Sequence, residues 1–345
     1  MSALLEININ GDVITLHEDI KTFIYEQVTK GSSMFLIEGK IDSTNWNMLD
    51  PFISDPDSNV QIRWGFTEEG NKWSNWHSII ASKVNMGYDV DTVRYLIQGH
   101  DLGFKLSENK TDTLYKDKLV SAIVQQIAGD NVISSEVTGT SGEYTIIQDV
   151  NDGKFIMDYL LPMAYNGSSK SFVFYFKDGN KLMFEPLETS KVYTQFSEVY
   201  TGVYIGNPSK FSDRLNVEYR SFDPYKREFL AKEVNDSSAG YRKLSGKTVY
   251  PPSGTNKVDY IDNIDKELFR ELATTKWHDD YIKMHDFVCY CQDPKMPVNQ
   301  LIDITVKDVN GANTLATGRY VITRNRVEIR GTEYMNLVFI SRRGA

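Results

Sequence analysis

The sequence predicts a β-rich α+β protein with several domains: two β-barrels, an α/β module inserted between them, and a small helical insertion in the second barrel. Two observations carry this prediction. Long stretches at both ends of the chain consist of short apolar runs between turn residues, which is the pattern of strands. Only the stretch between them combines two helical patterns with a hairpin pattern. At 345 residues the chain also exceeds the usual size of one domain.

Residues 1–108 are expected to form the first barrel. Asn10 and Gly11 separate two short apolar runs, which favours a hairpin at the start of the chain. Closure into a barrel or a sandwich is favoured because it removes exposed strand edges. Further strands are predicted by apolar alternation at Phe23 to Val28, Met34 to Ile41, Val60 to Phe66, His77 to Val84 and Val93 to Gly99.

Residues 109–190 are expected to form the α/β module. An apolar stripe with a spacing of four residues predicts an amphipathic first helix. The stripe consists of Tyr115, Leu119, Ile123 and Ile127, preceded by the capping residues Thr111, Asp112 and Thr113 and followed by Gly129 as the stop.

The rest of the module is predicted as a second helix and a hairpin. The second apolar stripe begins at Phe155 and is expected to kink or end near Pro162, whose ring opposes an intact helical turn. Asp178 and Gly179 then separate two apolar runs, Phe172 to Lys177 and Lys181 to Leu187. An Asp-Gly pair in this setting favours a hairpin, because both turn positions need a positive φ.

Residues 191–345 are expected to form the second barrel, with an insertion at about 233–279. Serine, glycine and proline dominate between Asn235 and Lys257, which indicates a surface loop or an insertion boundary. A short helix is predicted after this loop by Ile264, Leu268 and Leu272. From Phe287 onward the apolar residues alternate again, which predicts strands to the end of the chain.

Composition limits the classes of function. The 38 basic and 47 acidic residues give a net charge of −9, which disfavours sequence-specific DNA binding. No run of 18 apolar residues occurs and the start lacks a basic leader, so we expect neither a membrane span nor a signal peptide. Cys289 and Cys291 lie two apart in an expected strand, where side chains share one face and cannot bridge each other; we expect reduced core residues.

No motif in the sequence predicts a catalytic residue, a metal site or a cofactor site, so we expect a protein that is not an enzyme. His278, Asp280, His285 and Asp286 form the pattern that comes nearest to a metal-dependent hydrolase. They fall at expected strand ends and in loops, where solvated turn residues are the favoured interpretation. The hydrolase stays open as an alternative.

Trp64, Trp73 and Trp76 crowd one hairpin-like stretch and are the candidate interface residues. Tryptophan is enriched both in cores and at protein interfaces, and exposed aromatic rings can also form a carbohydrate platform. We favour core or interface, with sugar binding as the alternative.

Three segments carry a resemblance to a known family. They are Lys154 to Leu160 followed by Phe172 to Pro186, then Tyr219 to Glu228, and finally Gly318 to Arg342. In this order, and in the layout of barrel, module and interrupted barrel, the chain resembles the central baseplate hub of contractile phage tails. That family includes the late control protein D and VgrG hubs. The chain stops at Ala345, which resembles the stand-alone form without a fused spike.

The resemblance implies a structural protein of the virion tail baseplate, assembled in the host cytoplasm. Such hubs are homotrimers whose two tail-tube-like barrels per subunit make a pseudo-six-fold ring. The ring joins the tail tube to the central spike and lets DNA pass without specific binding. The implied partners are a separate spike protein, tail tube or tube-initiator proteins and baseplate wedge proteins, and no cofactor is implied. The hub of a bacterial contractile injection system and a carbohydrate-binding tail protein stay open as alternatives.

Charge is compatible with this role. Three chains would together carry about −27, three times the charge of −9 on one chain. Acidic residues along the channel would keep exiting DNA from sticking to the wall, because contacts to phosphate drive nonspecific binding.

Overall fold

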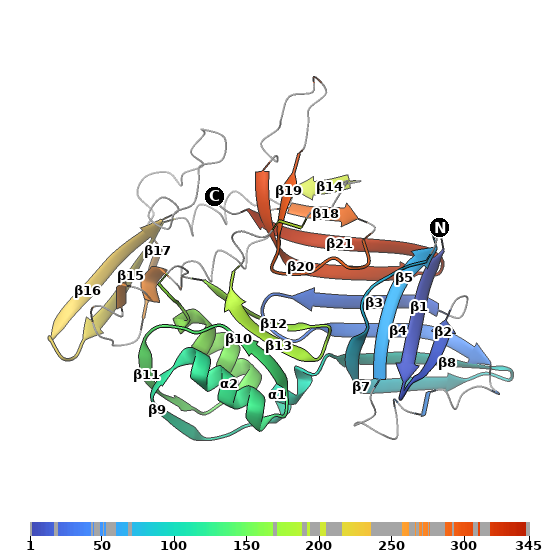
Figure 1. Cartoon of the computed structure of the whole chain (residues 1–345), viewed down its shortest axis with the longest axis horizontal. Helices are drawn as coiled ribbons and strands as arrows, with labels where there is room; N and C mark the ends of the chain where they lie inside the picture. Colours follow the sequence, from blue (N-terminus) through green and yellow to red (C-terminus); the bar gives the residue numbers. More distant parts are fainter. Residues whose placement is uncertain are drawn as a thin grey trace.

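The computed structural model confirms a β-rich protein with few helices (Figure 1). Most strands belong to one large sheet, and the others form three small sheets. The structure describes residues 2–16, 20–42, 44, 49–50, 52, 60–67, 71–167, 171–187, 192–193, 201–204, 216–235, 257–261, 266, 269–270, 272–274, 276, 287–291, 293–305, 310 and 318–342.

The large sheet joins the two ends of the chain. In Figure 1 the red strands β20 and β21 lie beside the blue strands β3 and β4. Neighbouring strands in this sheet are antiparallel throughout. The order is β14 (Thr201–Tyr204), β18 (Phe287–Cys291), β21 (Glu333–Arg342), β20 (Gly318–Arg330), β3 (Ile20–Val28), β4 (Met34–Asp42), β8 (Thr92–His100), β7 (His77–Tyr88), β5 (Val60–Thr67), β1 (Ala3–Ile9) and β2 (Asp12–Leu16), with β19 (Leu301–Ile304) beside β20 and β6 (Asn71–Trp73) beside β5.

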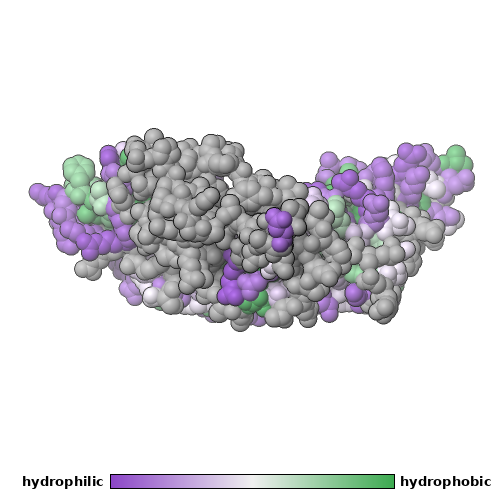
Figure 2. Space-filling view, turned by 90° about the horizontal axis from the view of Figure 1, so that it is seen from above, coloured by the Kyte–Doolittle hydropathy of each residue, from purple (hydrophilic) through white to green (hydrophobic). Residues whose placement is uncertain are grey.

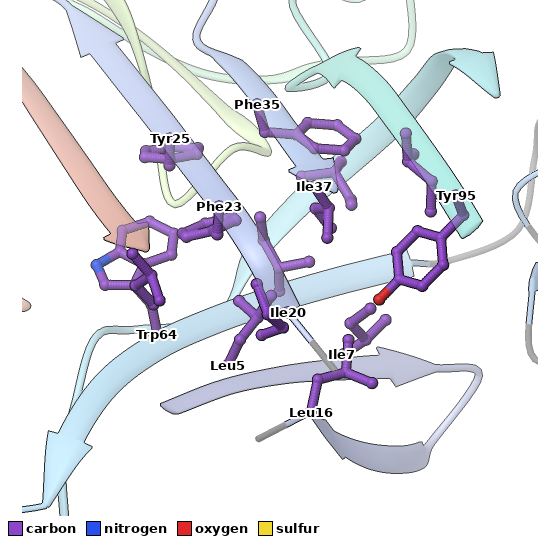
Figure 3. Close-up of a cluster of buried hydrophobic side chains, with 14 of the residues drawn as sticks. Leu5, Ile7, Leu16, Ile20, Phe23, Tyr25, Phe35, Ile37, Trp64 and Tyr95 are labelled. Carbon is purple, nitrogen blue, oxygen red and sulfur yellow. The ribbon is translucent and has the colours of Figure 1, made fainter. Parts of the chain in front are cut away.

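The predicted N-terminal strands are all present and enclose an N-terminal core (Figure 3). Side chains of β1 and β2 meet those of β3, β4 and β8, because alternate residues of each strand point to the same side. The predicted hairpin turn is confirmed by positive φ angles of 54° at Asn10 and 105° at Gly11. Val327 and Ile329 of β20 are also part of this core. The C-terminal strands therefore complete the hydrophobic core of the N-terminal ones.

The first predicted helix is correct only in its second half. Residues Thr113–Leu119 form strand β9, and helix α2 spans Val120–Asp130. Tyr115 is buried from the strand, because β9 pairs with β11 (Glu143–Gln148) over the central core. Of the predicted capping residues, Thr111 and Asp112 therefore precede a strand and Thr113 begins it, and the helix passes Gly129 by one residue. The spacing of the apolar residues is local information, whereas pairing with the distant strand β11 determines that this segment is a strand.

The second helix and the hairpin are confirmed. Asp152–Lys154 (α3) continues as a π-helix over Phe155–Leu160 and a 3₁₀ turn over Leu161–Met163, so the helical segment ends next to Pro162 as predicted. The hairpin strands are β12 (Phe172–Lys177) and β13 (Lys181–Pro186), with φ of 50° at Asp178 and 70° at Gly179. The remaining elements of this region are the short helix α1 (Phe104–Glu108) and β10 (Ser134–Val137), which pairs with β13.

Two more cores lie in the second half of the chain. The C-terminal core contains Cys289 and Cys291, both buried and free, as predicted for reduced core residues. The arm is a separate sheet of β16 (Glu228–Asn235), β15 (Asn216–Asp223) and β17 (Lys257–Tyr260), which packs on the helical residues Phe269 and Ala273. Most of the expected insertion, including Ile264 and Leu268 of its helix, lies outside the described residues.

Candidate assembly surface

The junction of β3 and β20 joins the two ends of the chain into one sheet. Seven residue pairs bring Thr22 to Val28 opposite Arg324 to Arg330. In β3, Phe23 and Tyr25 point into the N-terminal core, so the alternate residues point to the opposite face of the sheet. We call this opposite face of β21, β20, β3, β4 and β8 the outer sheet face.

A row of paired charges runs along the outer sheet face. Arg324 Nη2 lies 2.6 Å from Glu26 Oε2, and Arg326 Nε lies 2.7 Å from Glu328 Oε1. Arg330 Nη2 lies 3.0 Å from the other oxygen of Glu328. The side chains of Glu26 and Glu328 are only 12% and 7% exposed, so water screens these ion pairs weakly. Three arginines thus share two carboxylates, which compensate most of their positive charge, while Arg330 stays 66% exposed.

Apolar side chains accompany the charges on the outer sheet face. Met34 is 49% exposed, although the rest of its strand alternates between core and surface as expected. A long sheet face that mixes apolar groups with paired charges is typical of an interaction surface rather than of a purely solvated one. The half-buried apolar residues of this face are Ile24, Val28, Leu36, Leu96, Met335, Leu337 and Phe339.

Several strand edges are open in the described part of the sheet, among them those of β2 and β6, and two of them bound the series of strands that carries the outer sheet face. β14 pairs only with β18, and residues 80–88 of β7 pair only with β8. They lie at opposite ends of the eight-strand series β14-β18-β21-β20-β3-β4-β8-β7. An open edge presents unpaired backbone N–H and C=O groups and is a template for a strand of another chain.

The turn of the β12–β13 hairpin fixes the module against the first strands. The amide of Ser78 donates to the carbonyl of Asp178 (3.1 Å), and the amide of Leu102 donates to the carbonyl of Gly179 (2.9 Å). A Cβ on Gly179 would lie 2.2 Å from the carbonyl oxygen of Ser78. Only glycine therefore fits this contact, which also explains why the predicted Asp-Gly turn matters beyond its φ angles.

A polar cavity of about 260 Å³ lies where the hairpin, the N-terminal strands and the 294–300 segment meet. His77 lines it, with its ring stacked on Trp64 at 4.5 Å and its Nδ1 hydrogen-bonded to the hydroxyl of Tyr25 at 3.2 Å. Burial lowers the pKa of His77 to about 4, and the opposing effect of the Asp178 charge is smaller. The imidazole is therefore neutral at pH 7.

Asp101 is a second buried titratable group at the same joint. Its carboxylate accepts hydrogen bonds from the Ser32 hydroxyl (2.6 Å), the Ser33 amide (2.6 Å) and the Gly103 amide (2.9 Å). Burial raises the pKa of Asp101 to about 6, and these hydrogen bonds oppose the shift. The role of these contacts is structural, because they fix the exit from β8 into the module.

The three tryptophans separate into two groups. Trp64 is 1% exposed in the N-terminal core, so we withdraw it as an interface residue: a buried ring offers no surface to a partner or a sugar. Trp73 and Trp76 are half-buried and enclose the guanidinium of Arg63, at 4.6 and 4.5 Å from the ring centres. Arg63 Nε also donates to Glu6 at 2.6 Å. An interface at Trp73 and Trp76 stays a prediction.

The alternative of a metal-dependent hydrolase depends on four residues that lie near the C-terminal strands in the sequence. His278, Asp280, His285 and Asp286 all lie outside the described residues. Within the described ranges, no group of three or more histidine, cysteine, aspartate or glutamate side chains could hold a metal ion. No helix in that part of the chain has the length and hydropathy to cross a membrane.

No family model matches the sequence, and no curated protein matches it. Solved structures do match over almost the whole chain. A 43 kDa tail protein of prophage MuSo2 from Shewanella oneidensis has a TM-score of 0.63 at 11% identity, covering 99% of this chain and 97% of its own. A tail protein from Neisseria meningitidis MC58 has a TM-score of 0.62 at 7% identity, with the same coverage.

The chain has the fold of phage tail proteins. A further match is the Francisella PdpA-VgrG complex, with a TM-score of 0.57 at 12% identity, where this chain covers 58% of the matched chain. These likenesses confirm the expected fold at the level of phage tail and VgrG proteins. The hub role, the trimer and the passage of DNA go beyond a tail-protein fold.

The charged residues of the outer sheet face were not predicted as a surface from the sequence. A signal was present, because Arg324, Arg326, Glu328 and Arg330 alternate with Val327 and Ile329. Charged residues at every second position beside a buried apolar set indicate a strand with one face turned away from the core. The partner carboxylate, Glu26, lies 298 residues earlier, and nothing in the sequence links the two.

Proposed function

We propose that the chain is the central hub of a contractile phage-tail baseplate, a structural protein of the virion rather than an enzyme. In this role three copies form a ring between the tail tube and a separate spike protein, surrounded by wedge proteins. The tail-protein fold supports the proposal. Its domains are the barrels at 1–108 and 191–345 and the module at 109–190.

The observation that carries the proposal is the eight-strand series, in which β14 at one end and residues 80–88 of β7 at the other pair on one side only within the described residues. An isologous contact would use one edge twice and give a closed pair. A heterologous contact joins β14 of one copy to β7 of the next and forms a ring if the rotation closes. Each copy would contribute four strands from the N-terminal part and four from the C-terminal part. Three copies therefore give six similar blocks, which suits the match between a three-fold spike and a six-fold tube.

The outer sheet face would then line the channel. Its three arginines share two glutamates, so the wall offers less positive charge to DNA phosphates than unpaired arginines would. This differs from a wall that repels DNA by excess acidic charge, which the net charge of −9 first suggested. Arginines whose charge is mostly compensated by glutamates would also bind DNA only weakly.

The direct test is the oligomeric state of the purified full-length chain. We expect sedimentation to show a trimer at micromolar concentration, and negative-stain images to show a three-fold ring with a central hole. Addition of the spike protein should stabilise the ring. A monomer under all conditions, with and without spike, would overturn the proposal.

The likeness to the VgrG complex supports a second candidate, the hub of a bacterial contractile injection system. The ring and its channel would serve both machines, so geometry does not separate them. The genes beside the one for this chain would: capsid genes indicate a phage, and their absence beside sheath and tube genes indicates an injection system.

A further inference from the structure

The arm has an uncovered aromatic face. Its inner side chains pack on Phe269 and Ala273, but the side chains at alternate positions point away from that core. Phe229 is 88% exposed and Tyr260 is 67% exposed, although both lie in regular strands. Phe222 lies directly opposite Phe229, with 5.3 Å between the ring centres. The arm face is thus a cluster of three aromatic rings without an apolar cover.

The shape of the arm favours a contact with another molecule. The arm face borders a hollow of about 930 Å³ lined by Arg220, Phe222, Phe229 and Tyr260, among others. β15 and β16 project beyond the rest of the chain in Figure 1, and Figure 2 shows green atoms among purple ones at that same left end. Aromatic rings at this exposure offer roughly 300 Å², the size of a patch that is often functional.

The module has a second uncovered apolar face. Leu114 of β9 and Ile147 of β11 are register partners and are 59% and 66% exposed. Their neighbours Tyr115 and Gln148 are buried on the opposite side of the same two strands. We call the exposed side of β9 and β11 the module face.

The rims of the two faces carry opposite charges. The tip of the arm, between β15 and β16, carries Lys226 and Arg227, both exposed and neither in an ion pair within the described residues. The module face is bordered by four exposed acidic residues, Asp112, Asp117, Glu143 and Asp149, and by two exposed lysines, Lys110 and Lys116, so its rim is acidic on balance. Such complementarity favours an encounter between these two faces over an encounter of either face with its own copy.

We propose that the arm face of one copy docks on the module face of the next copy in the ring. The inference rests on the proposed trimer and adds a contact between subunits. An area of roughly 300 Å² is far below the roughly 1,600 Å² of a standard stable interface. The contact therefore supplements the joined sheet edges, and it selects the head-to-tail arrangement because arm and module faces differ.

Cross-linking tests this contact. Cys289 and Cys291 are buried, so cysteines introduced on the surface are the accessible thiols among the described residues. We would mix a tagged Phe229→Cys chain with an untagged Ile147→Cys chain, reassemble them and add a short bismaleimide. We expect a heterodimeric adduct in the mixture and none in either chain alone. Val13→Cys replaces Ile147→Cys in the control, because Val13 is a similarly exposed apolar residue on β2.

Charge reversal provides a second readout. The double variant Lys226→Glu, Arg227→Glu should weaken trimerisation about tenfold, and Glu143→Lys with Asp149→Lys on the same chain should restore it. A trimer that gives no adduct and ignores these reversals overturns the docking and leaves the ring intact. A chain that stays monomeric in every variant overturns the ring and the docking together.

Discussion

His77 and Asp101 show how burial at a joint couples the fold to pH. Both groups are almost fully buried, and burial favours the neutral form of each. For His77 this lowers the pKa, and for Asp101 it raises the pKa. A fall in pH therefore lowers the free energy of unfolding through His77 and raises it through Asp101. The unfolded chain takes up a proton at His77 before the folded chain does, whereas the folded chain takes up a proton at Asp101 before the unfolded chain does.

We expect His77→Gln to remove an acid-dependent loss of stability. With pKa values of about 6.5 unfolded and about 4 folded, the free energy of unfolding falls by about 2 kcal/mol from pH 7.5 to pH 5 through this group. Urea denaturation of both proteins at the two pH values measures the difference. Equal losses in wild type and variant would show that His77 is not held neutral.

We expect Asp101→Asn to remove an acid-dependent gain of stability. With pKa values of about 3.9 unfolded and about 6 folded, the wild type gains about 1.4 kcal/mol through this group over the same fall in pH. The variant cannot titrate there and should lack the gain. The same urea experiments measure it, and a gain retained in the variant would contradict the raised pKa.

At the scale of elements, the β12–β13 hairpin depends on one close backbone contact. Gly179 has a positive φ of 70°, and the carbonyl of Ser78 occupies the space where its Cβ would lie. Gly331 has a similar φ of 58° but nothing within 4 Å of its Cβ position. Alanine substitutions at the two glycines therefore distinguish the free-energy cost of backbone strain, present at both, from the cost of the steric clash, present only at Gly179.

We expect Gly331→Ala to lower the free energy of unfolding by about 1 kcal/mol, which is the cost of left-handed backbone strain for a residue with a Cβ. Gly179→Ala should lower it by about 3 kcal/mol, because a backbone carbonyl must also move. Urea denaturation of both variants measures the difference. Equal effects would show that the hairpin tip does not dock tightly on β7.

Sequence patterns predicted some secondary-structure elements correctly and others wrongly. Predicted strands with strict alternation, such as β4 and β8, are confirmed to within one residue at each end, because each has one face in a core. Tyr115 and Leu119 were assigned to a helix from their spacing, but β11 pairs with that segment about 30 residues later and holds it as a strand. Tertiary pairing overrides local preference there.

For the whole molecule, the proposed ring makes the outer sheet face the wall of a channel. Glu38 lies on this face and pairs with Lys21 at 2.6 Å. Glu136 lies on the module and pairs with Lys181 at 2.7 Å. The two pairs are chemically alike and both are partly exposed, so they form a matched set for testing which surface DNA meets.

We expect Glu38→Lys to raise the affinity of the assembled ring for nonspecific DNA roughly tenfold at low salt, because three copies add free cations to the wall. Phage that carry this variant should eject their genome more slowly. Glu136→Lys should change neither property. DNA binding measured against salt concentration and ejection kinetics provide the readouts, and equal effects of both variants would place Glu38 outside the channel.

The strand-rich class, the hairpin at Asp178 and Gly179, the core cysteines and the layout that resembles a tail hub could all be predicted from the sequence. These features depend on neighbours close in the chain, where alternation and turn chemistry act. Three features became visible only in the folded chain: β20 pairs with β3, Trp64 is buried while Arg63 lies between Trp73 and Trp76, and Glu26 pairs with Arg324. Those contacts join residues up to 298 positions apart, and a local pattern carries no information about which distant strand or charge will meet it.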